Sequence, residues 1–321
     1  MRARQPFAEI LDTSIGVDVL KKIEYVGRTC YKSTENIKEG SEEKFVANLI
    51  ERGHEAMLEH ASFCFEIEQH MYNWIRSTIK DLSDRYNFHS FIRFTHDDRI
   101  LMSGNTRAWR DLFKNIAEFA VIPDAFEAFI KDNPVLFPEF QDEFFYTFKE
   151  SIRPIYADDL RTEQEFLTHC DVTVRFVVDR GISHELVRHR PASFAQESTR
   201  YCNYSKGKFD SQITYIIPYG FDYGSPAWKI WKDAMECAEA YYMTMINTGV
   251  TPEWARTVLP NSLKTEVIMT ANCAEWKHFF NLRACNSTGK AHPQMLEVSR
   301  PLLDDFKKAV TVIFDDLTYG E

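Results

Sequence analysis

The chemistry-bearing residues of this chain are concentrated in positions 188–201, RHRPASFAQESTRY. Between residues 186 and 206 there are four cations and one anion, a local charge of +3 in a chain whose net charge is −10. Like charges held close together cost free energy unless an anion lies among them. Arginine presents a planar fork that pairs with two phosphate oxygens at once. The segment therefore indicates a site for a phosphorylated small molecule.

Each of these residues also has a structural interpretation when it is taken alone. Arg188 and Arg190 would more often be surface or ion-pair arginines than ligands, and His189 would more often be a structural histidine. Ser193 and Ser198 are also suited to helix caps. The clustering of cations, and not any single residue, favours a binding site.

Size and composition are typical of a soluble enzyme. The chain has 321 residues, 44% of them hydrophobic and 14% aromatic, which is enough for a sizeable core. The acidic balance argues against general nucleic-acid binding. We expect no signal peptide, because Met1–Ile10 lacks an apolar segment, and no stretch is long enough for a membrane span. The seven cysteines are scattered without a CxxC pair, so we expect reduced thiols in a cytoplasmic protein and no metal site.

The apolar pattern predicts separate strands and long helices, and hence an α+β fold. Residues 62–67 alternate as a half-buried strand does, 172–178 repeat the pattern, and 213–217 form a third strand. Ser183 is expected to cap a short helix that carries Glu185 and Arg188 on one face.

Helix signals dominate the C-terminal third. Ser225-Pro226 predicts the start of a long helix that Gly249 closes, and Thr251-Pro252 predicts the start of another. A last helix is expected from Pro293, with a break at Pro301. We expect one domain over residues 1–321, with an inserted, mostly helical subdomain at about 81–168.

The basic segment and three further blocks resemble one enzyme family, the flavin-dependent thymidylate synthases or ThyX family. Arg-His-Arg, seven residues and then Ser198-Thr199-Arg200-Tyr201 is similar to the signature of that family. Residues 53–63, 255–260 and 272–283 are similar to its upstream and downstream blocks. Four blocks in the family's order, over about half of the chain, are far more specific than one short motif.

The resemblance implies a fold with a central sheet flanked by long helices, and a homo-oligomer, a tetramer with active sites shared between subunits. It implies two sets of binding residues. The FAD set is His54, Glu59, Arg188, His189, Arg190, Gln196, Asn272 and His278. The dUMP set is Glu185, Arg188, Gln196, Glu197, Ser198, Thr199, Arg200, Arg256 and Arg283.

The implied reaction converts dUMP, methylenetetrahydrofolate and NADPH to dTMP, tetrahydrofolate and NADP, with the hydride carried by FAD. Methylation at C5 of uracil requires that carbon to become nucleophilic. Arg283 is the expected catalytic residue, because a cation stabilises negative charge on the ring. The one cysteine in the basic cluster, Cys202, has no recognisable activating partner in the sequence, so we expect no cysteine nucleophile.

Some positions depart from the family pattern. Alanine stands at 56, 195 and 274, where a polar side chain is common in the family, and His278 stands where an asparagine is expected. The segment from Cys285 to His292 is longer than expected. These departures concern individual contacts and one wall of the site.

Two other classes of function remain open at this point. One is a flavin- or nucleotide-binding relative that has lost catalysis, which would bind flavin without dUMP-dependent oxidation. The other is a nucleic-acid or phosphopeptide module, which would bind oligonucleotides in a salt-sensitive manner without flavin colour.

Overall fold

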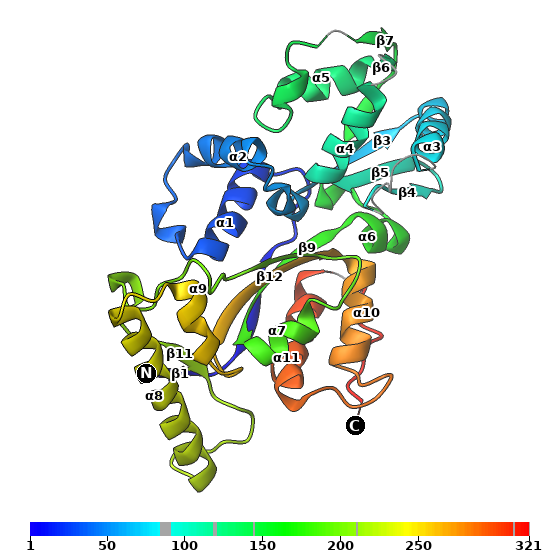
Figure 1. Cartoon of the computed structure of the whole chain (residues 1–321). Coiled ribbons are helices and arrows are strands. Elements are labelled where there is room, and N and C mark those ends of the chain that lie inside the picture. The colour runs from blue at the N-terminus through cyan, green and yellow to red at the C-terminus, as the bar shows by residue number, and fades with distance from the viewer. Residues whose placement is uncertain (84–90, 118–120, 144, 210, 311, 321) are drawn as a thin grey trace.

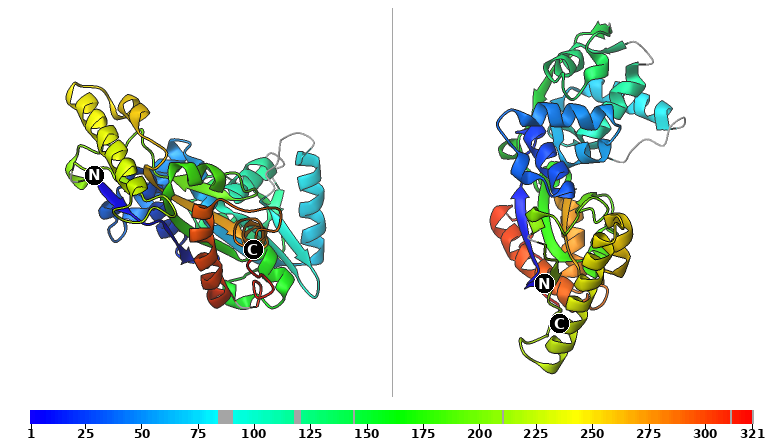
Figure 2. Two further views of the ribbon diagram at one scale, coloured as in Figure 1. Left: turned by 90° about the horizontal axis from the view of Figure 1, so that it is seen from below. Right: turned by 60° about the vertical axis from the view of Figure 1, so that its left-hand side comes forward.

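The computed structural model describes residues 1–83, 91–117, 121–143, 145–209, 211–310 and 312–320. Two four-stranded antiparallel sheets organise the chain (Figure 1). One lies in the lower body of the molecule with the C-terminal helices, and the other lies in the upper body, as the right-hand view of Figure 2 also shows. The mixture of helices and strands confirms the α+β class.

The first sheet has the strand order β10-β12-β9-β2. Its centre is the pairing of β9 (Asp171–Asp179) with β12 (Lys264–Asn272) over nine residue pairs. The edge strands are β10 (Ser193–Gln196) and β2 (Phe7–Asp12). Valine and phenylalanine side chains of β9 pack against α10 (Cys273–Arg283) and α11 (Pro293–Ala309), so the expected strand at 172–178 is confirmed.

The second sheet has the order β4-β5-β3-β8: Arg93–His96, Ile100–Asn105, Ser62–Ile67 and Ile152–Pro154. The strand expected at 62–67 is confirmed, but it is not half-buried, because five of its six residues are buried. Phe65 packs edge-to-face on Trp109 of α4 (Thr106–Ala117), while Cys64 belongs to the core beneath the first sheet. Side chains on both faces of β3 are therefore covered.

The segment at 81–168 is part of this second sheet and does not stand apart from it. Its described residues form β4, β5 and β8, the short parallel pair β6 (Val121–Pro123) and β7 (Tyr146–Phe148), and three helices, α4, α5 (Asp124–Asp132) and α6 (Glu163–His169). Residues 84–90, 118–120 and 144 of the expected insertion lie outside the described residues. The strands were not expected, because β5 is a continuous buried run without alternation, which periodicity alone cannot assign.

An ion pair joins the two sheets. Arg93 of β4 donates two hydrogen bonds to Asp171 of β9, at 2.7 and 2.8 Å. Burial alone would raise the pKa of Asp171, but the Arg93 guanidinium holds it below the usual range. Removing one partner of such a buried pair leaves the other charge unpaired, so this contact fixes the segment against the first sheet.

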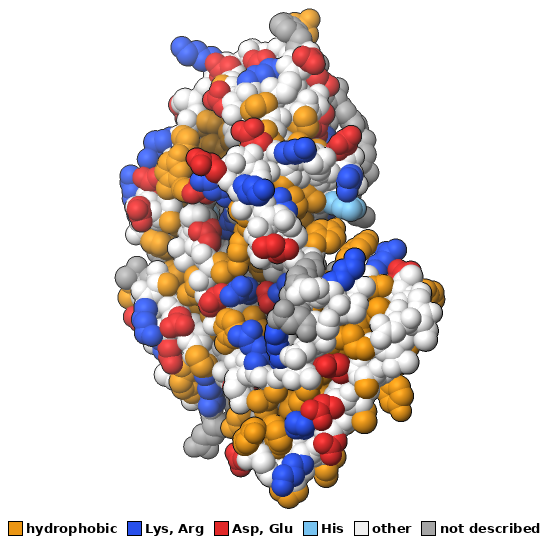
Figure 3. All heavy atoms as spheres, turned by 90° about the vertical axis from the view of Figure 1, so that its left-hand side faces the viewer, with side chains coloured by type: hydrophobic (Ala, Val, Ile, Leu, Met, Phe, Trp, Pro, Cys, Tyr) orange, Lys and Arg blue, Asp and Glu red, His pale blue; other side chains and the backbone are white. Residues whose placement is uncertain are grey.

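Helices α1 (Val19–Tyr31) and α2 (Ser41–Glu51) pack beside β10 and the 3-10 helix η2 (Glu55–His60). Helix α8 (Pro226–Asn247) and α9 (Pro252–Ala255) lie by β1 (Arg2–Arg4) and β11 (Thr214–Ile216), which pair in parallel. On the face in Figure 3, basic and acidic side chains are interspersed. Among the described residues, no helix has both the length and the apolar character of a membrane span.

Helix boundaries test the capping predictions. Ser225 caps α8 as expected, accepting a hydrogen bond from Trp228 N at 3.1 Å. The prediction that Ser183 caps a short helix is wrong. Asp179 accepts from Ile182 N at 2.7 Å, so α7 (Arg180–Leu186) begins earlier and Ser183 lies inside it. The prediction of a helix break at Pro301 is also wrong, because α11 continues through this residue. Val298, Leu302 and Phe306 are buried on either side of Pro301 and hold both halves in the core.

Three buried histidines make the fold sensitive to acid. The pKa of His60 and that of His169 are lowered to about 3, and that of His189 to about 4, chiefly by burial. Their hydrogen-bond partners include Thr270 Oγ1 for His60 and Ser103 Oγ for His169. Protonation is thus easier in the unfolded chain, where histidine has a pKa of about 6.5.

We predict that the free energy of unfolding falls as the pH drops from about 6.5 towards 4, since the unfolded state binds protons that the folded state excludes. Each histidine contributes up to about 1.4 kcal/mol per pH unit. Urea unfolding at pH 7.5, 6 and 5 measures the slope. His169→Gln, whose amide can still hydrogen-bond, should lower that slope, and an unchanged slope in this variant would contradict the assignment.

Candidate functional site

Arg283 lies at the centre of a charged group between α7 and α10. Its Nη1 donates to Glu185 Oε2 at 3.0 Å, and its Nε donates to His189 Nε2 at 3.1 Å. Ser299 Oγ donates to the backbone oxygen of Arg283 at 2.6 Å, which fixes the end of α10 on α11. The structure thus brings Arg283 to Glu185 and His189, which lie almost one hundred positions earlier in the chain.

His189 is held neutral in this group. Burial lowers its pKa to about 4, with further contributions from the charges of Arg283 and His278. Because the arginine can only donate, His189 Nε2 must accept, which leaves the proton on Nδ1. The ring packs edge-to-face on Phe279, with 4.9 Å between centroids, and lies 6.4 Å from that of His278. His189 therefore orients the guanidinium without adding charge.

The other two arginines of the Arg-His-Arg segment are exposed. Arg190 lies over the ring of Phe194, with its Cζ 5.4 Å from the centroid. Arg188 follows the end of α7, so it does not share a helical face with Glu185 as expected. The helix ends at Leu186, and Val187 is its C-cap.

A buried network of four charges lies beneath the next part of the segment. Glu197 is 3% exposed, and its Oε2 is 2.8 Å from Lys264 Nζ and 3.7 Å from Lys32 Nζ. Both lysines also pair with Glu266. Burial would raise the pKa of Glu266, but the two lysines hold it at about 2, and the pKa of Lys264 is raised by the carboxylates. Glu197 therefore serves this network in the structure.

Gln196 lies beside the network on β10 and faces α7. Its Nε2 donates to Ser183 Oγ at 2.9 Å and to Thr265 Oγ1 at 3.2 Å. The amide is half-buried. The first of these bonds joins the edge strand to α7, the helix that carries Glu185, and the second joins it to β12.

Downstream, the segment contacts α9 and the 3-10 helix η6 (Arg256–Val258). Arg256 Nη1 donates to Thr199 Oγ1 at 3.1 Å, and Arg200 Nε pairs with Glu253 Oε2 at 3.0 Å. Ser198 N donates to Cys30 O at 2.9 Å, which ties this turn to the end of α1. Two arginines and two hydroxyls thus lie together here, as the sequence predicts.

Glu59 and Asn272 line a small polar cavity of about 30 Å³ between the two sheets. Glu59 accepts from Arg107 Nη1 at 2.6 Å and from Ser193 Oγ at 3.1 Å. Asn272 caps α10, because its Oδ1 accepts from Glu275 N at 2.9 Å. Asn272 thus has a structural role at the start of α10, and the FAD contact expected of it stays a prediction.

His54 lines a larger cavity of about 580 Å³ at the ends of α1 and η2. Tyr31 and Tyr201 face each other across 5.5 Å between ring centroids, and Arg107 supplies a cation at the same wall. Cys30 also lines it, and burial raises the pKa of this thiol to about 11. Aromatic rings and a guanidinium suit a ligand with a flat ring and an anionic group.

The predicted residues fall into three groups along one segment: those at Arg283, those at Arg256 and those around Glu59 and His54. The segment from Glu185 to Tyr201 passes all three. Sequence reasoning missed several charged and aromatic partners, because each lies in a block without a recognisable motif or was assigned to the insertion. They are Tyr31, Lys32, Arg107, Lys264 and Glu266.

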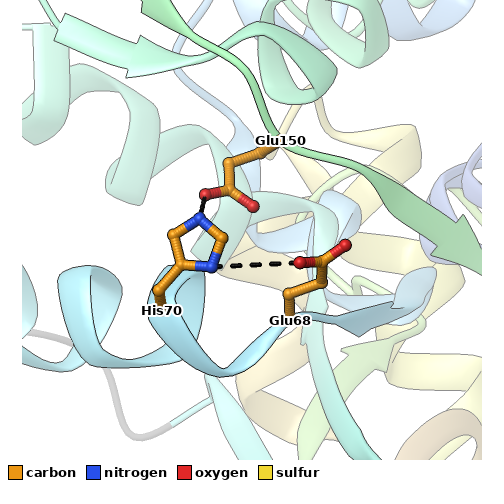
Figure 4. Close-up of side chains that lie close together, drawn as sticks. All are labelled: Glu68, His70 and Glu150. Atoms are coloured by element: carbon orange, nitrogen blue, oxygen red, sulfur yellow. Dashed lines mark ion pairs between the residues drawn. The ribbon is translucent and has the colours of Figure 1, made fainter.

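One group among the described residues has the composition of a metal site, although none was expected. Glu68, His70 and Glu150 bring their ligand atoms within 4.8 Å of one another. In Figure 4 the imidazole lies between the two carboxylates, which come from the residue just before α3 (Gln69–Ser83) and from the connection before β8. Two of the three side chains are more than 60% exposed. We therefore interpret the group as an ion pair that joins α3 to the connection between β7 and β8.

Comparison with known proteins identifies the class. A family described as thymidylate synthase complementing protein (Thy1) matches residues 15–90 and 147–310, well over half of the chain. The chain belongs to this family. Residues 91–146, which include β5 and α4, are not matched.

Curated relatives carry the particular name flavin-dependent thymidylate synthase. The one from Pyrococcus furiosus is 36% identical over 129 residues, which is 40% of this chain and 51% of the relative. That from Geobacter sulfurreducens is 34% identical over 159 residues, 49% of this chain and 65% of the relative. The chain thus aligns with about half to two thirds of these relatives' length.

Among solved structures, the UMP/dUMP methylase PolB from Streptomyces cacaoi, bound with 5-Br dUMP, matches with a TM-score of 0.43 and 15% identity. The match covers 98% of this chain and 96% of the other.

We predict that Lys264→Met destabilises the protein by about 2–4 kcal/mol, because it leaves Glu197 and Glu266 buried with only Lys32 to pair with them. Urea unfolding at pH 7 measures the change. Lys232→Met is the matched control, since Lys232 pairs with Glu236 on the surface of α8 and its loss should have little effect. Equal stability of both variants would show that the network contributes nothing.

Proposed function

We propose that this protein is a flavin-dependent thymidylate synthase. It converts dUMP, methylenetetrahydrofolate, NADPH and a proton to dTMP, tetrahydrofolate and NADP. The observation that carries the proposal is Arg283, held by Glu185 and neutral His189 within a chain of the Thy1 family.

The residues around the larger cavity fit FAD. A flat ring system needs apolar or aromatic walls, which Tyr31, Met57 and Tyr201 provide, and its phosphates need cations. The exposed Arg188 and Arg190 and the nearby Arg107 are available for that purpose. His54 and Glu59 would border the cofactor, and bound FAD would supply the hydride that no side chain can provide.

The uridylate would lie along the segment from Glu185 to Arg200. Arg256 and Arg200, with Ser198 and Thr199, form the basic and hydroxyl-bearing turn that suits a phosphate. Arg283 would face the pyrimidine ring and stabilise negative charge on it, so that C5 becomes nucleophilic. Because His189 is neutral, Glu185 is the one acidic side chain paired with this guanidinium among the described residues.

The thiols support a route without a cysteine nucleophile. Cys202 is fully buried. Cys30 lines the larger cavity, but a pKa of about 11 keeps it protonated, and a thiolate is the form that attacks. An arginine that stabilises the ring's charge gives C5 its nucleophilicity without thiol addition at C6.

We extend the proposal to three finer points. The chain is a single domain over residues 1–321 with an inserted segment at about 81–168, supported by the gap in the family match between residues 90 and 147. The enzyme acts as a homotetramer with shared active sites, supported by Ile230, Tyr241 and Trp254, which are apolar or aromatic and largely exposed. It works in the cytoplasm, supported by seven cysteines that form no disulfide within the described part of the chain.

The direct test is the identity of the bound chromophore. The purified protein should release FAD on denaturation or take it up on titration, and its reduced flavin should be oxidised when dUMP and methylenetetrahydrofolate are added. Flavin binding without that oxidation would favour the inactive relative. A protein that takes up no FAD would overturn the proposal.

We predict that Arg283→Ala slows the dUMP-dependent oxidation of the reduced flavin by about 10²–10³, because loss of one charge-stabilising donor has this effect in other enzymes. FAD affinity should change much less. Rapid-mixing kinetics measure the rate and titration measures the affinity. Cys202→Ser is the control and should turn over normally, whereas an inactive Cys202→Ser with an active Arg283→Ala would indicate a thiol mechanism.

A further inference from the structure

Arg107 is a cation at the candidate site that comes from the part of the chain unmatched by the family. It lies in the first turn of α4 and lines the cavity of about 580 Å³ together with His54 and Tyr201. The matched residues end at 90 and resume at 147. Arg107 thus belongs to the unmatched residues 91–146, but it contacts a cavity that is lined by residues of the matched part of the chain.

The contacts of Arg107 are directed at Glu59. Nη1 donates to Glu59 Oε1 at 2.6 Å, while Nε is 3.9 Å from Asp111 Oδ2. The Nε atom is buried and makes no hydrogen bond within the described part of the chain. The guanidinium side chain as a whole is 34% exposed. It therefore has donor capacity beyond the pair with Glu59.

Glu59 needs such a partner if an anion binds beside it. It is 18% exposed, and its other oxygen accepts from Ser193 Oγ, which contributes no charge. A carboxylate next to an anionic ligand would repel it, and partial burial strengthens that repulsion. The arginine cancels the charge of Glu59.

We propose that Arg107 is a further ligand-binding residue of this enzyme, one that neutralises Glu59 and offers its remaining donors to the anionic group of a ligand with a flat ring. The proposal rests on the proposed function, which supplies two such ligands, FAD and the folate. The unmatched segment then completes the binding site as well as the second sheet.

Helix α4 has buried anchors other than Arg107, so the role of this arginine can be tested in a folded variant. Trp109 and Phe113 anchor the helix and are at most 2% exposed. A similar ion pair elsewhere in the second sheet serves as a control. Arg153 Nη2 lies 2.6 Å from Glu66 Oε2, and neither residue lines the cavity.

The experiment measures FAD affinity by fluorescence titration, and tetrahydrofolate affinity of the FAD-loaded protein by calorimetry. The variants are Arg107→Ala, Glu59→Gln, the double variant and Arg153→Ala. We expect Arg107→Ala to weaken one ligand by about ten- to a hundredfold, as for the loss of a charge-assisted hydrogen bond. Arg153→Ala should bind both ligands as the wild type does.

The double variant separates a charge effect from a merely structural one. Glu59→Gln removes the charge that Arg107 cancels, so the losses of the two single variants should not add. Loss of FAD affinity places the dinucleotide beside Arg107, and loss confined to tetrahydrofolate places the folate there. Unchanged affinities in Arg107→Ala, or additive losses, overturn the proposal. A wild-type protein that does not bind FAD would instead contradict the proposed function.

Discussion

The antiparallel pairing of β9 with β12 is the constraint on which the site depends. Each strand leads directly into a helix, and the two helices begin at opposite ends of the ladder, at Asp179 and Asn272. Helix α10 runs for 11 residues, about 16 Å at 1.5 Å per residue, before it presents Arg283 to Glu185. A shift of register would separate these two residues, because each is reached from a fixed end of its strand.

The buried network of two lysines and two glutamates also depends on the pairing of β9 with β12. The edge strand β10 joins the ladder through β12, and this brings Glu197 over Lys264 and Glu266. Two lysines and two glutamates then balance, with no net charge in a largely buried place. Such a set stabilises one arrangement of the segment that follows, because each charge is left without a partner in any other arrangement.

The sequence predicted the family correctly, but it predicted the local geometry of the site only in part. The spacing of Arg188, Ser198 and Arg283 pointed to the family, and the strands at 62–67 and 172–178 followed from alternation. The prediction of a cap at Ser183 was wrong because Asp179, which directly follows the buried Val178 at the end of β9, is the residue that accepts from Ile182 N. Lys264 and Arg107 could not be assigned, since their importance arises from pairing with Glu197 and Glu59, which are distant in the chain.

The unmatched segment is structurally inseparable from the part of the chain that the family model matches. Its strand β5 hydrogen-bonds along the whole length of β3, and its helix α4 covers Phe65 on that strand. A relative without these residues would need another cover for β3 and another cation for Glu59. The length of this segment and the identity of the residues on η2 are therefore expected to change together in evolution. The segment and the rest of the chain form one fold, and the segment is not a separate domain.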